Sequence, residues 1–344
     1  MASPASQPIV LEGFAPNLNK QLHIGHLKNL AAANALSRIL QPCQPTAMLG
    51  ASLGIIPGAL EALHALFDFV GYHPRICFDT DLSPKSVPTT SGAGQQSGCQ
   101  VWQGPLGPVI VIKANGQPTY ACHDLAYAQA VQPDCYITGC EQQEHFAALG
   151  LASKHLPIGL VLGPDGKKIR SSAGDPFLAS AAFDAVIAQL APTPEPRKLA
   201  WNILAFNFLQ AALASSNKFD PVQMTKPTAA GMYVSYTLAK VHSALVKGGV
   251  GRTLDGPPPC LTAGDVQLLG LAAYSAFFLR KAAAAKDPAP LANYLLSLAK
   301  GLAKVYAQQS IKNGAAGLQF AVGQAFQTLE RGMIALGLFP LLEV

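Results

Sequence analysis

The sequence has few charged residues, no paired cysteine motif and no long apolar run. Of its 344 residues, 12% are charged and 50% are hydrophobic, which is typical of a globular chain rather than a disordered one. The seven cysteines are an odd number without a C-x-x-C pair, so we expect neither a disulfide framework nor a protein-bound metal site. No run of 18 residues is both uncharged and apolar, so we expect no membrane-spanning helix.

The start of the chain and its charge distribution bear on location and partners. The opening MASPASQPIV lacks the basic start and apolar stretch of a signal peptide, which predicts a cytoplasmic protein with neither membrane nor DNA as a partner. Residues 1–190 carry 10 Lys and Arg against 12 Asp and Glu, whereas residues 191–344 carry 14 against 7. A basic second half favours an RNA partner, although solvated lysines on helices give the same balance. No pattern predicts an oligomeric state.

The chain divides into an α/β half and a helical half. Residues 1–190 alternate apolar strand-like runs with helical patterns, which predicts an α/β domain with a mainly parallel sheet. The proline-rich stretch 191–198 predicts a boundary, and the remainder shows apolar residues at helical spacing, as in a helical bundle. We therefore expect a domain of residues 1–190 followed by an all-α domain of residues 191–344.

Two histidines and a glycine stand where an apolar strand-like segment, residues 8–14, gives way to an amphipathic helical pattern, residues 22–40. The first turn of a helix has free backbone N–H groups and a partial positive charge, so it is a natural phosphate site. His23 and His26 share one face of that turn, and Gly25 leaves room for a ligand to approach. The alternative is a pair of ordinary surface histidines at a helix start.

A basic loop follows the last strand predicted in the first half. The glycine-rich turn at residues 163–166 precedes Lys167, Lys168 and Arg170, with Ser171 and a second serine after them. A glycine-flanked loop with three cations can close over a triphosphate. The alternative is a solvated basic turn.

A tyrosine and an aspartate begin another predicted helix, after an alternating strand and an Asn-Gly turn. Tyr120 and Asp124 are four residues apart and therefore share a helix face. A carboxylate can hold a guanidinium in a bidentate fork while a phenol supplies one more contact. Alternatively, Asp124 only charges the helix N-terminus and Tyr120 packs.

These motifs resemble the signatures of class I aminoacyl-tRNA synthetases, and the longer forms resemble the arginyl enzymes. The string HIGH at 23–26 resembles their nucleotide-binding signature, and KIRSS at 168–172 is similar to their KMSKS loop. The segment 120–124 resembles the one that reads the arginine side chain, and residues 227–245 resemble the helix that begins the tRNA-binding bundle. The chain looks like a compact form without the usual N-terminal tRNA-elbow domain, and Cys122 and His123 depart from the family pattern.

The resemblance implies a Rossmann-like nucleotide-binding domain that activates arginine with ATP and Mg²⁺ and transfers it to tRNA. It assigns the phosphates in the transition state to His23 and His26, and the departing pyrophosphate to Lys168 and Arg170. The remaining assignments are Gly25, Lys167 and Ser171 to ATP; Glu12, Asn17, Tyr120, Asp124 and Gln142 to the amino acid, with His145 a neighbour; and Tyr233, Tyr236 and Lys240 to tRNA. Three further side chains also have a structural alternative: His145 is an ordinary helix histidine, and Tyr233 and Tyr236 are core residues.

Two other functions remain open on the sequence alone. One is an ATP-dependent ligase that passes activated arginine, or an analogue, to the amine of a small molecule or peptide without tRNA. The other is a non-catalytic tRNA-binding protein. The two phosphate-binding motifs argue against the latter, because a chain freed from catalysis has no physical reason to keep both.

Overall fold

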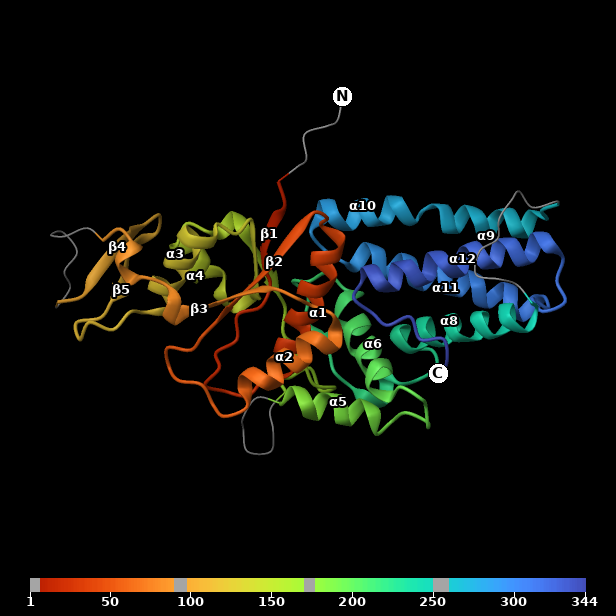
Figure 1. Cartoon of the computed structure of the whole chain (residues 1–344), viewed down its shortest axis with the longest axis horizontal. Helices are drawn as coiled ribbons and strands as arrows, with labels where there is room; N and C mark the ends of the chain where they lie inside the picture. Colours follow the sequence, from red (N-terminus) through yellow and green to blue (C-terminus); the bar gives the residue numbers. More distant parts are fainter. Residues whose placement is uncertain (1–6, 90–97, 170–176, 250–259) are drawn as a thin grey trace, which may run out of the picture. The chain divides into compact units, whose positions relative to one another are not determined.

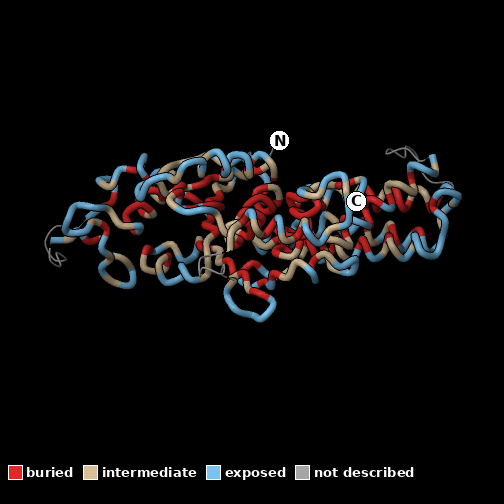
Figure 2. Tube along the Cα trace, turned by 90° about the horizontal axis from the view of Figure 1, so that it is seen from below, coloured by how far each residue is buried: buried red, intermediate tan, exposed pale blue. Residues whose placement is uncertain are grey.

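The computed structural model describes residues 7–89, 98–169, 177–249 and 260–344 (Figure 1). Contacts divide the chain into two compact units. Unit 1 consists of Met1–Leu160 with Ala214–Ser216, and unit 2 of Val161–Leu213 with Asn217–Val344. Buried residues, red in Figure 2, run through the interior of each unit.

Unit 1 is built on a five-stranded parallel sheet with the order β3-β2-β1-β6-β7. The strands are β1 (Ile9–Glu12), β2 (Cys43–Leu49), β3 (Arg75–Phe78), β6 (Cys135–Gly139) and β7 (His155–Ile158). Because every pairing is parallel, the carboxyl ends of the strands meet at one edge, where such sheets bind ligands. The central strand β1 ends at Glu12, which therefore lies at this edge of the sheet.

Four α-helices and a hairpin accompany this sheet. The helices are α1 (Ile24–Ile39), α2 (Ala59–Val70), α3 (Tyr120–Val131) and α4 (Gln143–Ala148); the hairpin pairs β4 (Gln100–Gly104) with β5 (Gly107–Ile112); and the 3₁₀ turns are η1 (Asp79–Asp81), η2 (Pro84–Ser86), η3 (Cys140–Gln142) and η4 (Ala152–Lys154). Most of α1 is buried, including Leu27, Leu30 and Leu36 at 0% exposure, because its surface is apolar on several sides and it packs against β1, β2 and β6.

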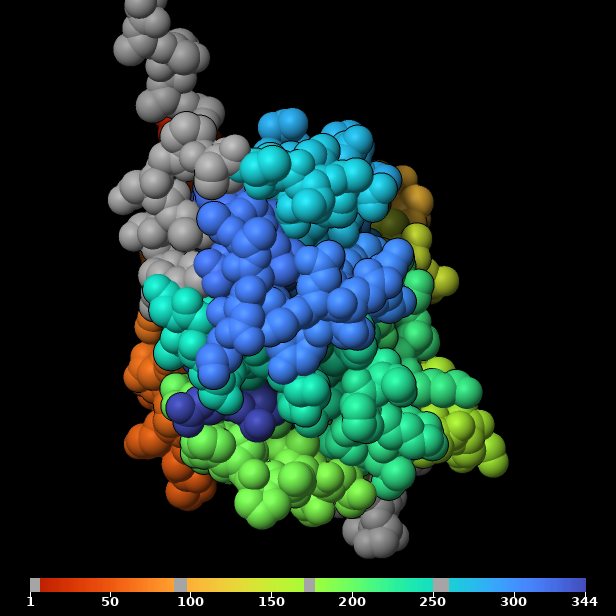
Figure 3. All heavy atoms as spheres, turned by 90° about the vertical axis from the view of Figure 1, so that its right-hand side faces the viewer, coloured from red at the N-terminus to blue at the C-terminus, as the bar shows by residue number. Residues whose placement is uncertain are grey.

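Unit 2 is mainly helical. It contains a two-stranded parallel sheet of β8 (Val161–Leu162) and β9 (Asn217–Lys218), and the helices α5 (Ala179–Ile187), α6 (Pro196–Leu209), α7 (Pro221–Met224), α8 (Ala230–Lys247), α9 (Ala263–Ala273), α10 (Ser275–Ala285), α11 (Ala289–Gln308) and α12 (Ala316–Ala335). The later helices pack side by side and fill the face seen in Figure 3. The predicted succession of a Rossmann-like parallel sheet and a helical domain is confirmed.

The boundary between the two units lies between Leu160 and Val161, before the proline-rich stretch 191–198. Helix α5 packs against α6, with the rings of Phe183 and Trp201 stacked 6.3 Å apart. By contact, the residues from Val161 onward therefore belong to the helical unit, apart from Ala214–Ser216, which belong to unit 1. The division of function into residues 1–190 and 191–344 stays a prediction.

The helices α9 and α10, with Tyr274 between them, form an exposed apolar stretch. Among the described residues, Ala263–Ala285 is long and apolar enough to cross a membrane, and 17% of its most apolar part is buried. Length and composition alone make this a weak indication, because core helices of soluble proteins and signal sequences pass the same test.

Candidate functional site

The two histidines of the HIGH motif cap their own helix. His23 is the N-cap of α1, and its Nδ1 accepts from the Gly25 N–H at 3.1 Å. In return, the His23 N–H donates to Nδ1 of His26 at 3.0 Å, which completes a reciprocal capping box. The two rings stack with their centroids 3.8 Å apart and an angle of 29° between them.

This capping determines which ring nitrogen of each histidine remains available as a donor. An Nδ1 that accepts from a backbone N–H carries no proton, so a neutral ring holds its proton on Nε2. Burial, and secondly the neighbouring His23, lower the pKa of His26 to about 3. His26 is therefore neutral at physiological pH, and its chemistry is that of a hydrogen-bond donor at Nε2 rather than that of a cation.

A buried carboxyl group lies at the end of the central strand. Glu12 is 2% exposed, and its Oε1 accepts from the Phe14 N–H at 3.2 Å. Burial, and next the negative charge of Asp124, raise the pKa of Glu12 to about 8. The Phe14 ring in turn contacts the His26 ring edge to face, with centroids 6.0 Å apart. Phe14 thus contacts both Glu12 and the histidine turn.

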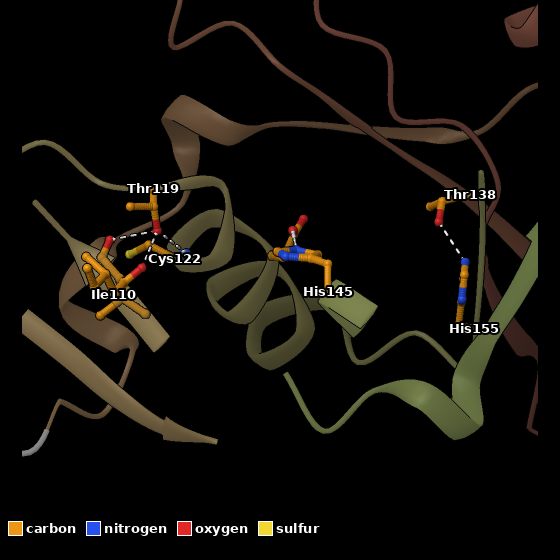
Figure 4. Close-up of polar contacts among 8 residues, drawn as sticks. Ile110, Thr119, Cys122, Thr138, His145 and His155 are labelled. Carbon is orange, nitrogen blue, oxygen red and sulfur yellow. Dashed lines mark hydrogen bonds and ion pairs between the residues drawn. The ribbon is translucent and has the colours of Figure 1, made fainter. Parts of the chain in front are cut away.

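Asp124, the second carboxylate, is paired with a histidine. His145 Nε2 lies 2.6 Å from Asp124 Oδ2, with the side chains 30% and 20% exposed (Figure 4). Helix α3, which carries Asp124, is held by Thr119, whose hydroxyl accepts from the Cys122 N–H and donates to the Ile110 carbonyl of β5. These bonds fix where α3 begins, and so where Asp124 lies.

Helix α4, which carries His145, is held by stacked rings. Phe146 stacks on His155 with centroids 4.6 Å apart and lies 5.2 Å from Tyr136. The Nε2 of His155 is 2.8 Å from the Thr138 hydroxyl of the neighbouring strand β6. The aromatic packing therefore places His145 against Asp124.

Tyr136 is a member of this cluster that the sequence analysis missed. In the β1–β6 register Tyr136 is the partner of Glu12, so both side chains leave the same face of the sheet. The hydroxyl is buried and has no hydrogen-bond partner among the described residues. Burial, then Glu12 and then Asp124, raise its pKa. Only the strand pairing could have revealed it, because nothing near Tyr136 in the sequence marks it.

The other predicted amino-acid contacts lie at the surface of unit 1. Asn17 is exposed and bridges to Gly50, just beyond the carboxyl end of β2. Tyr120, the first residue of α3, is 55% exposed, and Gln142, the N-cap of α4, is also exposed. Their exposure is compatible with contacts to a ligand, and it argues against the alternative that Tyr120 is a packed residue.

The basic loop begins from the small sheet of unit 2. Lys167 and Lys168 are exposed, the Lys167 carbonyl accepts from the Gly163 N–H at 2.7 Å, and Lys168 bridges to Leu162. Arg170 and Ser171 lie outside the described residues. In the described ranges, no three His, Cys, Asp or Glu side chains gather as metal ligands.

A cation lies between two aromatic rings on the helices of unit 2. Lys240 of α8 places its Nζ 4.6 Å from the ring centroid of Tyr236 and 5.7 Å from that of Tyr306 on α11. Tyr236 and Tyr306 are 39% and 42% exposed, whereas Tyr233 is half-buried. Two of the three predicted tRNA contacts are thus brought together, with Tyr306 as a partner that the sequence analysis missed.

Comparison with known proteins points to one family. An arginine–tRNA ligase of Exiguobacterium sibiricum is 28% identical over 232 residues, and one of Limosilactobacillus reuteri is 28% identical over 254 residues. A solved structure of a candidate arginyl-tRNA synthetase of Campylobacter jejuni, 16% identical, aligns over 98% of this chain and 94% of its own with a TM-score of 0.73. This chain is arginyl-tRNA synthetase-like.

The match to the curated relatives is partial. It covers 58% and 64% of this arginyl-tRNA synthetase-like chain, and 41% and 45% of the two ligases. The chain thus spans less than half the length of these relatives, and no protein-family model matches it. The structural likeness establishes the fold, while the roles of the individual site residues stay predictions.

Proposed function

We propose that this chain activates arginine with ATP to form arginyl adenylate and transfers the arginine to tRNA. The observation that carries the proposal is the arrangement at the end of β1. There Phe14 contacts both the doubly capped histidine turn and Glu12, whose pKa reflects the charge of Asp124. This arrangement supports a phosphate site and a pair of carboxyl groups for an organic cation within one unit.

In the adenylation step, a carboxylate oxygen of arginine attacks the α-phosphorus of ATP and the bond to pyrophosphate breaks. The protein has little covalent work to do, so catalysis rests on positioning and on stabilising the charge on the phosphates. The rings of His23 and His26 would donate from Nε2 to phosphate oxygens. Lys167, Lys168 and Arg170 would hold the departing pyrophosphate, and Mg²⁺ would arrive bound to the triphosphate.

The anionic cluster supports a guanidinium as the bound group. Asp124 can accept two guanidinium N–H bonds, and Tyr120 stands at the exposed start of the same helix. Glu12 adds a second carboxyl group that loses its proton readily when a cation enters. Asn17 and Gln142 would orient the α-amino and α-carboxyl groups.

A role for tRNA is supported by unit 2. The cluster of Tyr236, Lys240 and Tyr306 combines two exposed rings with a cation, as single-stranded nucleic acid sites do. The excess of Lys and Arg in residues 191–344 would attract an RNA backbone. We expect the protein to act in the cytoplasm, where charged tRNA is used.

The decisive experiment is amino-acid-dependent ATP–pyrophosphate exchange with each of the twenty amino acids, with and without total tRNA. Exchange that is specific for arginine and depends on tRNA, together with arginylated tRNA as the product, is the expected result. Exchange indifferent to tRNA would indicate a ligase with an amine acceptor instead. No exchange, with tRNA still bound, would indicate a non-catalytic tRNA-binding protein.

A further inference from the structure

A buried lysine follows the histidine turn and has no part in the scheme above. Lys28 of α1 is 1% exposed, and its Nζ donates to the Gly159 carbonyl at 2.8 Å and to the Ser215 carbonyl at 2.7 Å. A buried ammonium is costly unless its protons are bonded. Both acceptors belong to unit 1, so one side chain of the histidine helix holds two distant pieces of backbone.

The two acceptors lie two residues before the paired strands β8 and β9, and β8 leads to the basic loop. Gly159 precedes β8, which runs into the turn and then to Lys167 and Lys168. Ser215 precedes β9, whose Asn217 pairs with Val161 of β8. The same ammonium therefore holds the backbone at the start of both paired strands.

The two backbone segments approach each other closely. A Cβ on Gly159 would lie 2.4 Å from the carbonyl oxygen of Ser215 and 2.5 Å from that of Ala214, so only glycine allows this approach. The crowded carbonyls need a donor between them, and an apolar side chain in place of Lys28 could fill the space without supplying it. Burial disfavours the charged form of Lys28 and lowers its pKa to about 8, while the nearby Cys140 acts in the opposite direction.

We propose that Lys28 is a positioning residue for adenylation: its ammonium fixes the backbone that leads into the basic loop to the helix that carries His23 and His26. The inference rests on the proposed function and deepens it. Lys28, Gly159 and Ser215 all lie in unit 1, so the clamp holds the histidine helix against this backbone within one unit, and catalysis by positioning is sensitive to displacements of about 1 Å. Loss of the clamp then slows the chemical step and leaves ATP binding in the ground state largely unchanged.

The test uses the full chain with Lys28→Met, which keeps most of the side-chain volume and removes the donors, and Lys28→Arg, which keeps a charged donor. We expect Lys28→Met to lower kcat of ATP–pyrophosphate exchange by about 10²-fold, with KM for ATP within about threefold of the parent. Lys28→Arg should recover much of kcat. Similar kcat values for the parent and Lys28→Met, or a change confined to KM, would overturn the proposal.

Lys154 supplies a matched control. Its Nζ donates to the Pro133 carbonyl at 2.8 Å elsewhere in unit 1, so Lys154→Met also deletes a lysine–carbonyl bond. We expect Lys154→Met to have a lower melting temperature than the parent and an unchanged kcat. If both lysine variants lose kcat in proportion to their stability, Lys28 is merely structural. Should Lys28→Met not fold, Lys28→Gln, which retains one donor group, is compared with Lys154→Gln on the same criterion.

A double mutant tests whether Lys28 acts through the backbone that leads to the basic loop or affects activity independently of the loop. If Lys28 acts through the backbone that leads to Lys168, the combination of Lys28→Met with Lys168→Ala should be about as slow as the slower single variant. Multiplication of the two single effects would overturn the proposal, because it would mean that the two residues act independently.

Amide hydrogen exchange tests the clamp without any activity. Peptides that cover residues 157–163 and 213–219 should exchange at least about tenfold faster in Lys28→Met than in the parent or in Lys154→Met. Unchanged hydrogen exchange in these peptides would show that Lys28 does not hold the two backbone segments. If the parent catalyses no ATP–pyrophosphate exchange with any amino acid, the proposed function fails, and hydrogen exchange still decides whether Lys28 holds the two segments.

Discussion

The two units carry their functional charges in opposite ways. In unit 1 the groups that matter are buried, with Glu12 and Lys28 2% and 1% exposed, and burial is the largest cause of each altered pKa. In unit 2 the lysines of the basic loop and Lys240 are exposed. Buried charges are expensive and hold precise geometry, whereas exposed ones are screened by salt and act mainly on association. We therefore expect substitutions of the buried charges in unit 1 to have larger effects than substitutions of the exposed charges in unit 2.

The largest effect should come from Asp124→Asn in unit 1. Its loss removes a charged partner of the guanidinium, so we expect the efficiency of arginine-dependent ATP–pyrophosphate exchange to fall by about 10² to 10³-fold. The matched control is Asp134→Asn, since Asp134 is an aspartate of unit 1 that accepts the Val10 N–H and lies outside the cluster. Arginine activation that survives in Asp124→Asn would remove the guanidinium assignment.

The next effect concerns the observed role of His26 as a helix cap and its proposed role as a hydrogen-bond donor to phosphate. Glutamine at the third helical position can serve a capping box as His26 does, but alanine cannot. We expect His26→Ala to lose about 1 kcal/mol of stability and about 10²-fold in adenylation, whereas His26→Gln loses adenylation alone. Thermal melts and exchange assays on both variants check this. Activity in His26→Gln within about tenfold of the parent would leave His26 as a cap only.

A smaller effect is the pH dependence of stability that buried groups give unit 1. Glu12 has its pKa raised from 4.5 to about 8, so the folded state binds more protons and stability falls as pH rises through that window. His26, with its pKa lowered from 6.5 to about 3, acts in the opposite direction below pH 6.5. Between pH 6.5 and about 7 the Glu12 contribution dominates, at about 1 kcal/mol per pH unit, whereas Lys28, with its pKa lowered from 10.5 to about 8, acts in the opposite direction as the pH approaches 8.

Urea unfolding of the parent and of Glu12→Gln across this range measures the contribution. The variant mimics the protonated carboxyl group, so its stability should decline less between pH 6.5 and 8 than that of the parent. If the free energy of unfolding of the two proteins depends on pH in the same way, Glu12 is already ionised in the folded state. The contrast between buried and exposed charges would then lose its main support.

The smallest expected effect lies on the exposed side of the comparison. Lys240→Gln should weaken tRNA binding a few-fold at low salt and reduce the slope of log affinity against log salt by about one. Lys281→Gln, an exposed lysine of α10, is the control and should change the slope less. Equal changes in the two variants would show that Lys240 contributes only to the general positive charge of unit 2.

The sequence predicted the parts of the site that are local. The spacing of His23, Gly25 and His26 placed both histidines on the first turn of a helix, and the structure has that turn with the two rings stacked. Contacts between groups far apart in sequence were less predictable. The pairing of Tyr136 with Glu12 and the hydrogen bond between His145 and Asp124 could not be predicted, because these contacts depend on strand register and on the packing of Phe146.

Three features can therefore be predicted from the sequence, since each follows from interactions within a few residues: the order of elements, the helix start that caps itself, and the place of the basic loop along the chain. The burial of individual side chains, and with it their change in pKa, depends on the tertiary structure. Lys28 is the clearest case. In sequence it is an ordinary helix lysine, and only the approach of the Gly159 and Ser215 backbones makes it a buried donor to both, because desolvation and hydrogen-bond partners arise from chain segments that meet only in the fold.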